Sequence, residues 1–308
     1  MRAAVIGTGG IGGYFGGRLA AGGHEVWFVA RGPHLDRIRS DGLRVSSVHG
    51  DFAIRPARAT DDPAAIGPVD VVLLSVKTWQ VPAAAAALAP LMGPDTGVIT
   101  TQNGVEAPRH AAAVVGEAAV LPGTAKVFAN IEEPGHIRHS GGPGSLAIAE
   151  WDNRPSPRAD RVREALVEAG IPSPVPVDIW VELWAKLLFV EPFGALGAAF
   201  DEPIGEVRGV PEHRQLLEDA MREVEAVARS RGVALPEGVV AESLAFIDQL
   251  PAGGTSSLQR DLHAGRPSEL DAWTGAVVRL GAESGVPVPV HRVLLEVLKA
   301  RHPAALPR

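Results

Sequence analysis

The sequence contains no cysteine, which excludes disulfides, a thiolate nucleophile and cysteine-ligated metal sites. Lysine is also scarce, because only four of the 29 basic residues are lysines. Arginine stays protonated near neutral pH, whereas a partly desolvated lysine can exchange a proton, so each lysine is a candidate for proton transfer. The four are Lys77, Lys126, Lys186 and Lys299.

Long apolar runs and an excess of positive charge are missing as well. The longest apolar stretch, 187–200, is interrupted by Glu191 and Pro192 and falls short of the ~20 residues that a membrane helix needs. The N-terminus enters a glycine cluster within six residues, unlike a secretory signal. A net charge of −7 gives no general attraction to nucleic acid or anionic lipid. We expect a cytoplasmic protein without a nucleic-acid or membrane partner.

What is present is the composition of a soluble globule: 308 residues, 46% of them hydrophobic. At ~100–200 residues per domain, this length indicates two domains. In the first half, short β-branched runs alternate with helical stretches, the pattern of a doubly wound α/β sheet. We predict strands at 2–6, 25–30, 70–76 and 97–101, helices at 11–21, 33–40 and 82–91, and β additions to the sheet at 43–59 and 135–150.

The pattern changes at residues 171–177, where three prolines in seven residues indicate an edge strand or a linker. Beyond this point apolar residues recur at helical spacing. We predict helices at 178–199, 211–230, 236–250, 267–284 and 290–301, with Asp178 as an N-cap and Pro211, Pro236 and Pro267 in first turns. The expected fold is therefore an N-terminal Rossmann-type doubly wound sheet, residues 1–177, followed by an all-helical domain, residues 178–308.

A glycine motif directly follows the first predicted strand and opens the first helix. Gly7, Gly9 and Gly12 fit G-x-G-x-x-G, with Gly10 and Ile11 between them. In such a motif the glycines allow a tight turn, the approach of a pyrophosphate and close packing of helix on strand. The motif predicts a dinucleotide site, against the alternative of a plain glycine-rich turn.

The end of the second strand distinguishes the nicotinamide cofactors. An acidic residue there accepts from the ribose of NAD, whereas an arginine accommodates the 2′-phosphate of NADP. Here the strand ends at Arg31, and no carboxylate follows until Asp36. This favours NADPH, although Arg31 could instead be one more solvated arginine.

Reduction of a carbonyl by hydride needs an acid that protonates the oxygen. Tyr14, the only tyrosine, lies in the first helix and is expected to be a packing residue. His136 and His139 have no obvious carboxylate partner, and their spacing makes a poor metal pair, so no metal site is predicted.

Five groups of residues together resemble the ketopantoate reductase (2-dehydropantoate 2-reductase) family, from residue 2 to about residue 295. The asparagine–glycine pair, the lysine and the spacing of the serines from the glutamate carry the resemblance. The groups are Gly7–Gly12, Ser75–Lys77, Gln102–Gly104, Trp184–Leu187, and Ser256–Gln259 followed by Gly265–Asp271.

The resemblance implies a role for each matching residue. Lys186 matches the general acid, and Glu269 the glutamate that orients substrate and lysine. Ser257 resembles a donor to the substrate carboxylate, Asn103 the asparagine where nicotinamide and substrate meet, and Lys77 a lysine near the cofactor. The implied activity is NADPH-dependent reduction of a small 2-oxo acid, ketopantoate, to the 2-hydroxy acid, which belongs to pantothenate biosynthesis.

The chain departs from the family at three positions. Where the family usually carries asparagines, this sequence has Val190, Gly194 and Gly254. We therefore expect Val190 and Gly194 to line an altered substrate site. The same chemistry on another 2-oxo acid or ketone, and a non-enzymatic NADPH-binding regulator, stay open as alternatives. The helical domain could support a homodimer, and the sequence decides neither this nor the stereochemistry of the product.

Overall fold

The computed structural model describes residues 1–306 and divides them into two compact units. The first unit comprises Met1–Gln102 and Ala107–Ile179, and the second comprises Asn103–Glu106 with the chain from Trp180 onward. This division lies close to the expected boundary after residue 177. It differs in one respect, because four residues from the middle of the first predicted domain belong to the helical unit.

The first unit contains one sheet with the order β4-β3-β9-β8-β7-β6-β1-β2-β5. Six of these strands, β5-β2-β1-β6-β7-β8, are parallel to their neighbours and have the connectivity of a doubly wound dinucleotide-binding sheet. The bounds are β1 Arg2–Ile6, β2 Glu25–Val29, β5 Arg58–Thr60, β6 Val71–Leu74, β7 Gly97–Thr100 and β8 Val120–Glu133. The predicted fold class is confirmed.

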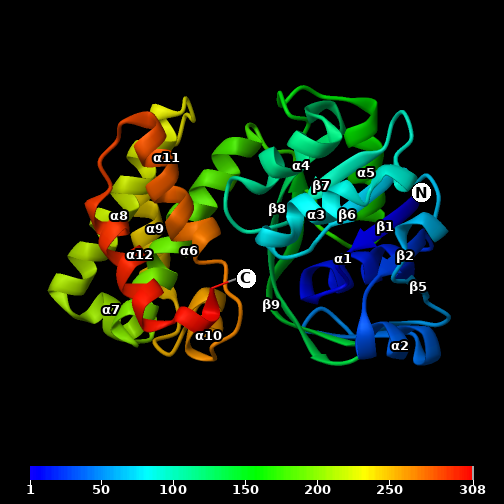
Figure 1. Cartoon of the computed structure of the whole chain (residues 1–308), viewed down its shortest axis with the longest axis horizontal. Helices are drawn as coiled ribbons and strands as arrows, with labels where there is room; N and C mark the ends of the chain where they lie inside the picture. Colours follow the sequence, from blue (N-terminus) through cyan, green and yellow to red (C-terminus); the bar gives the residue numbers. More distant parts are fainter. Residues whose placement is uncertain (307–308) are drawn as a thin grey trace. The chain divides into compact units, whose positions relative to one another are not determined.

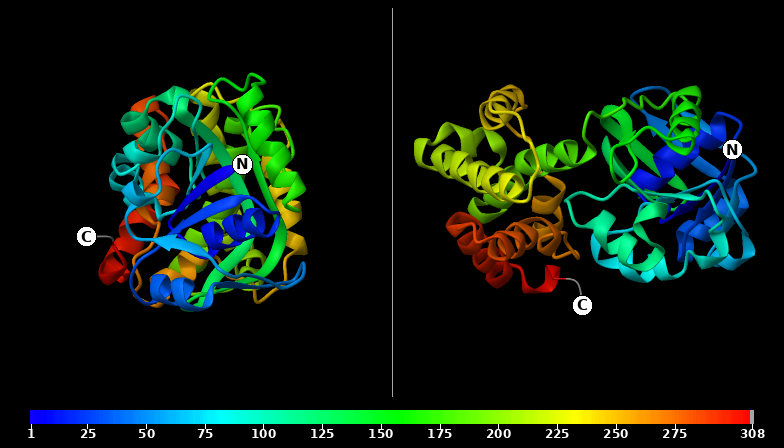
Figure 2. Two further views of the ribbon diagram at one scale, coloured as in Figure 1. Left: turned by 90° about the vertical axis from the view of Figure 1, so that its right-hand side faces the viewer. Right: turned by 90° about the horizontal axis from the view of Figure 1, so that it is seen from above.

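The central strands are buried on both faces, as a parallel sheet requires. In β1, Ala3 and Val5 join one core cluster, whereas Ala4 and Ile6 join the other. Helices pack on both faces of the sheet (Figures 1 and 2). On one face lie α1 (Gly10–Ala21), α2 (Gly32–Asp41) and α5 (Pro157–Glu168); on the other lie α3 (Val81–Ala86), the short helix η3 (Ala89–Leu91) and α4 (Ala107–Val115).

The β additions differ from the prediction in two ways. The stretch 43–59 is not one addition. β3 (Leu43–Ser47) pairs with β9 and β4 (Phe52–Ile54) pairs with β3, whereas β5 pairs with β2 at the opposite edge. Strand β9 (His136–Ile148) was expected, but its antiparallel partner β8 was not. Pro122 and Gly123 lie inside β8, although proline and glycine are both unfavourable in the interior of a strand.

The proline-rich residues 171–177 form a linker without regular secondary structure. It runs beside the sheet, where the Leu146 N–H donates to the Pro172 carbonyl and the Ser173 hydroxyl donates to the Leu146 carbonyl. Asn153 stabilises the start of the next helix, which begins at Ile179. Its Oδ1 accepts from the Ile179 N–H at 2.8 Å, and its amide donates to the Asp178 carboxylate.

The second unit is helical, as predicted. Its helices are α6 (Ile179–Phe200), α7 (Ile204–Gly209), α8 (Pro211–Ser230), α9 (Val239–Gln249), α10 (Ser257–His263), α11 (Ala276–Ser284) and α12 (Pro289–Arg301). The short α7 and α10 were not predicted. The helix expected from residue 267 is wrong at its start, because residues 266–268 have no regular secondary structure and the helical region begins with a π-helical turn, Asp271–Gly275.

Helix α6 is the one helix within residues 1–306 that is long and apolar enough to cross a membrane. Two thirds of its most apolar window, 67%, is buried inside the structure, so most of this apolar surface packs against the rest of the protein.

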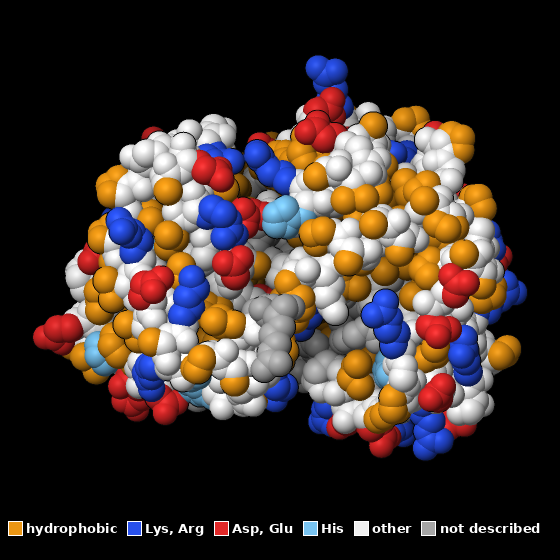
Figure 3. Space-filling view, viewed as in Figure 1, with side chains coloured by type: hydrophobic (Ala, Val, Ile, Leu, Met, Phe, Trp, Pro, Cys, Tyr) orange, Lys and Arg blue, Asp and Glu red, His pale blue; other side chains and the backbone are white. Residues whose placement is uncertain are grey.

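On the visible surface, basic and acidic side chains are interspersed (Figure 3).

Candidate active site

The glycine motif forms a tight turn at the carboxyl end of β1. Gly7 has φ +93°, a conformation that favours glycine, and the N–H groups of Gly7 and Thr8 both donate to the Val29 carbonyl. A β-carbon at Gly12 would lie 2.3 Å from the Gly7 carbonyl oxygen, so only glycine lets α1 pack this closely on the turn. Gly10 and Ile11 begin α1.

The glycine turn and the first residues of α1 fit a dinucleotide. A β-carbon at Gly9 would meet nothing within 4 Å, so this side of the turn is open to an approaching group. Helix α1 has no acidic residue in its first turn and no side-chain cap, which leaves its N-terminal N–H groups available to a phosphate. The turn also lies beside the boundary between β1 and β6, where the strand order of a doubly wound sheet reverses and ligands bind.

Arg31 lies at the N-cap of α2, just beyond β2, and is exposed. His34, three residues beyond Arg31, lies outside every motif of the sequence. The Nδ1 atom of the His34 ring accepts from the Gly135 N–H at 3.0 Å. Burial lowers the pKa of His34, with a smaller opposing effect of the Thr8 backbone, so its imidazole is neutral near pH 7.

Lys77 follows β6 and is exposed, with its backbone N–H bound to the Gln80 side chain. Gln102, noted in the sequence only as part of a motif, has a definite structural function. Its buried amide donates to the carbonyls of Leu74 at 2.7 Å and Val76 at 2.9 Å. Gln102 thus holds together the carboxyl ends of β6 and β7 next to Lys77.

Asn103 begins the short segment that belongs to the second unit. A β-carbon at Gly104, which has φ +92°, would lie 2.9 Å from the Ala272 carbonyl oxygen in the π-helical turn. Glu106 forms an ion pair with Arg279 of α11 at 2.7 Å, and Arg279 also contacts Asp271. Within this unit, Asn103 is therefore held close to the turn that follows Glu269.

Lys186 and Glu269 both lie in the second unit. Lys186 is half-buried on α6, two residues beyond the buried Trp184. Glu269 is 8% exposed and precedes the π-helical turn, in which the Trp273 N–H donates to the Glu269 carbonyl. The preceding Ser268 is fixed, since its N–H and hydroxyl both donate to the Ala305 carbonyl.

The two serines have different environments. Ser256 is the buried N-cap of α10 and accepts from the Gln259 N–H, whereas Ser257 is exposed. A β-carbon at Gly194 would lie 2.8 Å from the Ser256 hydroxyl oxygen, so this packing leaves no room for an amide there. Val190, half-buried, is four residues after Lys186 and lies on the same face of α6. Gly254 forms a turn in which its carbonyl accepts from the Ile204 N–H.

Tyr14 is a packing residue, as expected, with 1% exposure and contacts to the rings of Phe15 and His139. The expectation that neither histidine has a carboxylate partner is wrong for His136, whose Nδ1 lies 3.2 Å from Glu132. Glu132 lies on β8, a strand that was not predicted, four residues before His136. Their pairing across the β8–β9 turn was therefore not predicted either. Both histidines belong to the β extension of the first unit.

The second unit contains a buried ionic group that was not predicted from the sequence. Glu191 and His291 are fully buried, and their Oε2 and Nε2 atoms are 2.7 Å apart. The other ring nitrogen of His291 lies 2.6 Å from Glu223, and the Thr274 hydroxyl donates to Glu191 at 2.6 Å. Burial by itself lowers the pKa of His291, but the charge of Glu191 and hydrogen bonds to both carboxylates raise it to about 9. At neutral pH an imidazolium therefore lies between two carboxylates.

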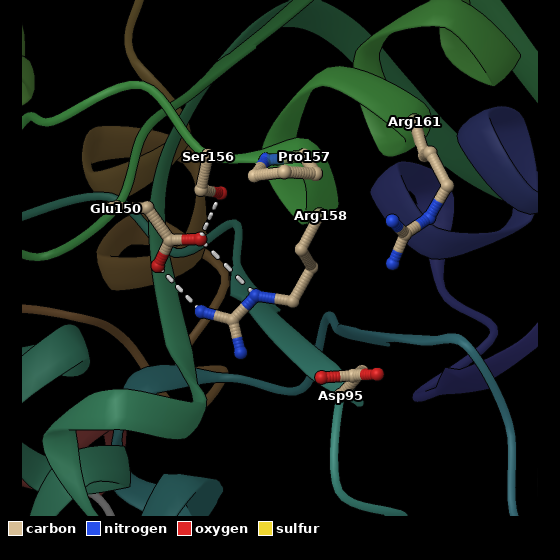
Figure 4. Close-up of a pocket in the computed structure, with 6 residues that line it drawn as sticks. All are labelled: Asp95, Glu150, Ser156, Pro157, Arg158 and Arg161. Carbon is tan, nitrogen blue, oxygen red and sulfur yellow. Dashed lines mark hydrogen bonds and ion pairs between the residues drawn. The ribbon is translucent and has the colours of Figure 1, made fainter.

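A separate cavity of about 300 Å³ lies in the first unit (Figure 4). It is lined by Asp95, Glu150, Ser156, Pro157, Arg158 and Arg161, and Glu150 binds both Ser156 and Arg158. Asp95 precedes β7, so the cavity lies at the amino ends of the parallel strands. The glycine turn lies at their carboxyl ends, where ligands of such sheets bind. None of the residues predicted to be functional lines this cavity.

Comparison with known proteins shows the family to which this chain belongs. A family model described as ketopantoate reductase PanE/ApbA matches residues 3–153, and the model of its C-terminal part matches residues 178–302. The chain belongs to the ketopantoate reductase family. The family resemblance inferred from the motifs is thus confirmed for both halves of the chain.

Individual members of the ketopantoate reductase family match over nearly their whole length. A 2-dehydropantoate 2-reductase of Halobacterium salinarum is 33% identical, covering 97% of this chain and 98% of that protein. The crystal structure of a family member from Ralstonia eutropha has a TM-score of 0.90 at 32% identity, covering 98% and 99% of the two chains. D-mandelate dehydrogenase with NADH and anilino(oxo)acetate shares the fold, with a TM-score of 0.88 at 21% identity over 99% of both chains.

Ketopantoate reductases are oxidoreductases that act on a carbonyl or hydroxyl group. Membership of the family implies a nicotinamide cofactor and a small 2-oxo acid substrate. The open glycine turn in the first unit fits such a cofactor, and Lys186 and Glu269 in the second unit are groups suited to carbonyl chemistry.

Proposed function

We propose that this protein reduces 2-dehydropantoate (ketopantoate) to pantoate with NADPH, and that Lys186 is the general acid. The observation that carries the proposal is the half-buried position of Lys186 on the apolar helix α6, in the same compact unit as the nearly buried carboxylate of Glu269. Curated relatives at 33% and 31% identity are named 2-dehydropantoate 2-reductase, which supports the choice of substrate.

In this proposal each of the chain's site residues has a defined role. The glycine turn and the start of α1 hold the phosphates, and Arg31 holds the 2′-phosphate that distinguishes NADPH from NADH. The bound nicotinamide supplies the hydride. Lys186 donates a proton to the carbonyl oxygen and stabilises the negative charge that develops there. Ser257 and Asn103 bind the substrate, Lys77 lies near the cofactor, and Glu269 orients Lys186.

A second substrate class is favoured by the composition of α6. Val190 replaces an amide on the face of the helix that carries Lys186, and Gly194 leaves no space for one. A hydrogen bond to a charged group contributes roughly 1.5–3 kcal/mol, so two missing amides would weaken ketopantoate binding by about a hundredfold or more. The alternative function is therefore the same reduction of a 2-oxo acid with a more apolar side chain.

The test is the rate of NADPH oxidation by the purified protein with ketopantoate and with a panel of other 2-oxo acids. We expect Lys186→Ala to lower kcat by roughly 10²–10⁴-fold with little change in NADPH affinity, because only proton transfer is lost. Turnover within threefold of the unmodified protein would refute the role of Lys186. Tight NADPH binding without turnover of any carbonyl would favour a regulator over an enzyme.

A further inference from the structure

The buried group formed by Glu191, His291 and Glu223 connects three helices of the second unit. Glu191 lies on α6, Glu223 on α8 and His291 on α12. Glu223 also accepts from the backbone N–H groups of Val290 and His291, at 2.8 and 3.1 Å, and so fixes the first turn of α12. Both ring nitrogens of His291 and both carboxylate oxygens of Glu191 have a hydrogen-bond partner, as buried charges require.

Glu191 also connects α6, which carries Lys186, with the π-helical turn that lies just after Glu269. Oε2 of Glu191 binds His291, whereas Oε1 accepts the hydroxyl hydrogen of Thr274 at 2.6 Å. Thr274 lies in the π-helical turn Asp271–Gly275, which begins two residues after Glu269. π-Helical turns are rare and occur often at functional sites. Thr274 is fully buried, so water does not compete for this hydrogen bond.

Glu191 lies next to a proline inside α6, so its contacts also affect the direction of the helix. Glu191 is followed by Pro192, which lies inside the helix. A proline in a helix interior removes one backbone hydrogen bond and weakens or bends the helix at that point. The segment with Lys186 precedes this weak point, so its direction depends on side-chain contacts made next to the proline. Glu191 supplies such contacts.

Glu191 does not lie on the side of α6 that carries Lys186. At about 100° per residue, five positions place Glu191 roughly 140° around α6 from Lys186, on the opposite side of the helix. Val190 occupies the side of Lys186 instead. Any effect of Glu191 on the reaction must therefore pass through the positions of α6 and the π-helical turn.

We propose that Glu191, held by His291 and Glu223, is a positioning residue that fixes the π-helical turn after Glu269 against the helix of Lys186 through the hydroxyl of Thr274. This inference rests on the proposed function, in which Lys186 and Glu269 act on the same substrate. Displacement of a reacting group by about 1 Å can lower a rate a hundredfold, so one buried hydrogen bond can influence turnover without touching the substrate.

The test compares three variants of the full-length protein. Thr274→Val keeps the shape of the side chain but removes the hydroxyl, whereas Thr274→Ser keeps the hydroxyl. Thr96→Val is the matched control, because Thr96 is also buried and its hydroxyl donates to the Val69 carbonyl, near the amino end of β7 in the first unit. We expect Thr274→Val to lower kcat roughly tenfold without a change in NADPH affinity, and Thr274→Ser to restore at least half of kcat. Thr96→Val should leave kcat unchanged.

Equal kcat values for Thr274→Val and Thr96→Val would overturn the proposal, even if both variants were less stable. Lys186→Ala, assayed in parallel, separates this outcome from a failure of the proposed function. If Lys186→Ala keeps full turnover, the assigned acid is wrong. If it is inactive while Thr274→Val is unaffected, only the positioning role of Glu191 is wrong.

A second readout does not depend on the substrate. The chain has four lysines, so ¹³C-methylation of its amines gives few NMR signals, and loss of one signal in Lys186→Arg assigns Lys186. We expect Thr274→Val to shift the Lys186 signal and Thr274→Ser to return it towards its original position. An unchanged signal in Thr274→Val would show that Lys186 is positioned independently of Glu191.

Discussion

The two units hold their predicted functional groups by different means. In the first unit the groups are held through the backbone: Gly7 and Gly12 shape the turn, and the side chain of Gln102 binds the backbone carbonyls of Leu74 and Val76. In the second unit, side chains from distant helices do it, with Glu191 and His291 a hundred positions apart in the chain. A site made of backbone leaves a local motif in the sequence, whereas a site made of long-range side-chain pairs does not.

The largest expected effect breaks the side-chain network. His291→Leu leaves the fully buried Glu191 carboxylate without its cation, and removal of one partner of a buried pair costs about 3–5 kcal/mol. We expect a decrease of that size in the free energy of unfolding, measured by urea denaturation. The double variant Glu191→Leu/His291→Leu should recover most of it, since apolar residues of similar volume can replace a buried pair. Recovery of none of it would mean that the ion pair is not the cause.

The second effect is the dependence of stability on pH. The folded-state pKa of His291, about 9, lies above its ordinary value of 6.5. The folded protein therefore binds this proton more tightly, and the stabilisation is complete below pH 6.5 and disappears as the pH rises through 9. We expect a loss of up to about 3 kcal/mol in the free energy of unfolding between about pH 6.5 and pH 10. The Glu191→Leu/His291→Leu variant, measured alongside, should lack this component.

The third effect separates binding from folding in the first unit. Gly9→Ala adds a methyl group that contacts no protein atom within 4 Å, so its melting temperature should match that of the unmodified protein. The methyl group would obstruct the pyrophosphate, and we expect NADPH affinity to fall roughly 10- to 100-fold, about 1.4–2.8 kcal/mol. Gly209→Ala, where a β-carbon also meets nothing, is the control for calorimetric titration. Unchanged affinity in Gly9→Ala would mean that the turn does not bind the phosphates.

The smallest effect concerns a single exposed side chain. Arg31→Ala should weaken NADPH binding by about tenfold, the scale of one charge-assisted hydrogen bond, and leave NADH binding nearly unchanged. Fluorescence titration with both cofactors measures the difference. Equal losses for NADPH and NADH would contradict the assignment of Arg31 to the 2′-phosphate.

The comparison between the units also explains what the sequence could predict. The glycine motif, the alternation of strands and helices, and the long helices α6, α8 and α12 follow from local periodicity, and the structure confirms them. Strand β8 was not predicted, because Pro122 and Gly123 are local signals against a strand that pairing with β7 and β9 overrides. The placement of Asn103–Glu106 with the helical unit depends on contacts with Ala272 and Arg279, which no local pattern contains.

One signal for the buried network was present in the sequence. Glu191 is the only charged residue in the apolar stretch from Leu187 to Phe200, and a carboxylate inside such a helix needs a buried partner. The sequence could not say which of ten histidines is that partner, because the choice depends on how α6 and α12 pack.

The strand order of the sheet has a consequence for the folding of the chain during synthesis. β9 lies between β3 and β8, so the β3–β4 hairpin is joined to the rest of the sheet only through a strand made about 90 residues later. Non-local pairings of this kind close slowly. On the ribosome, the β3 edge of the hairpin stays unpaired until residues 136–139 have emerged, and an unpaired strand edge of this kind is prone to aggregation.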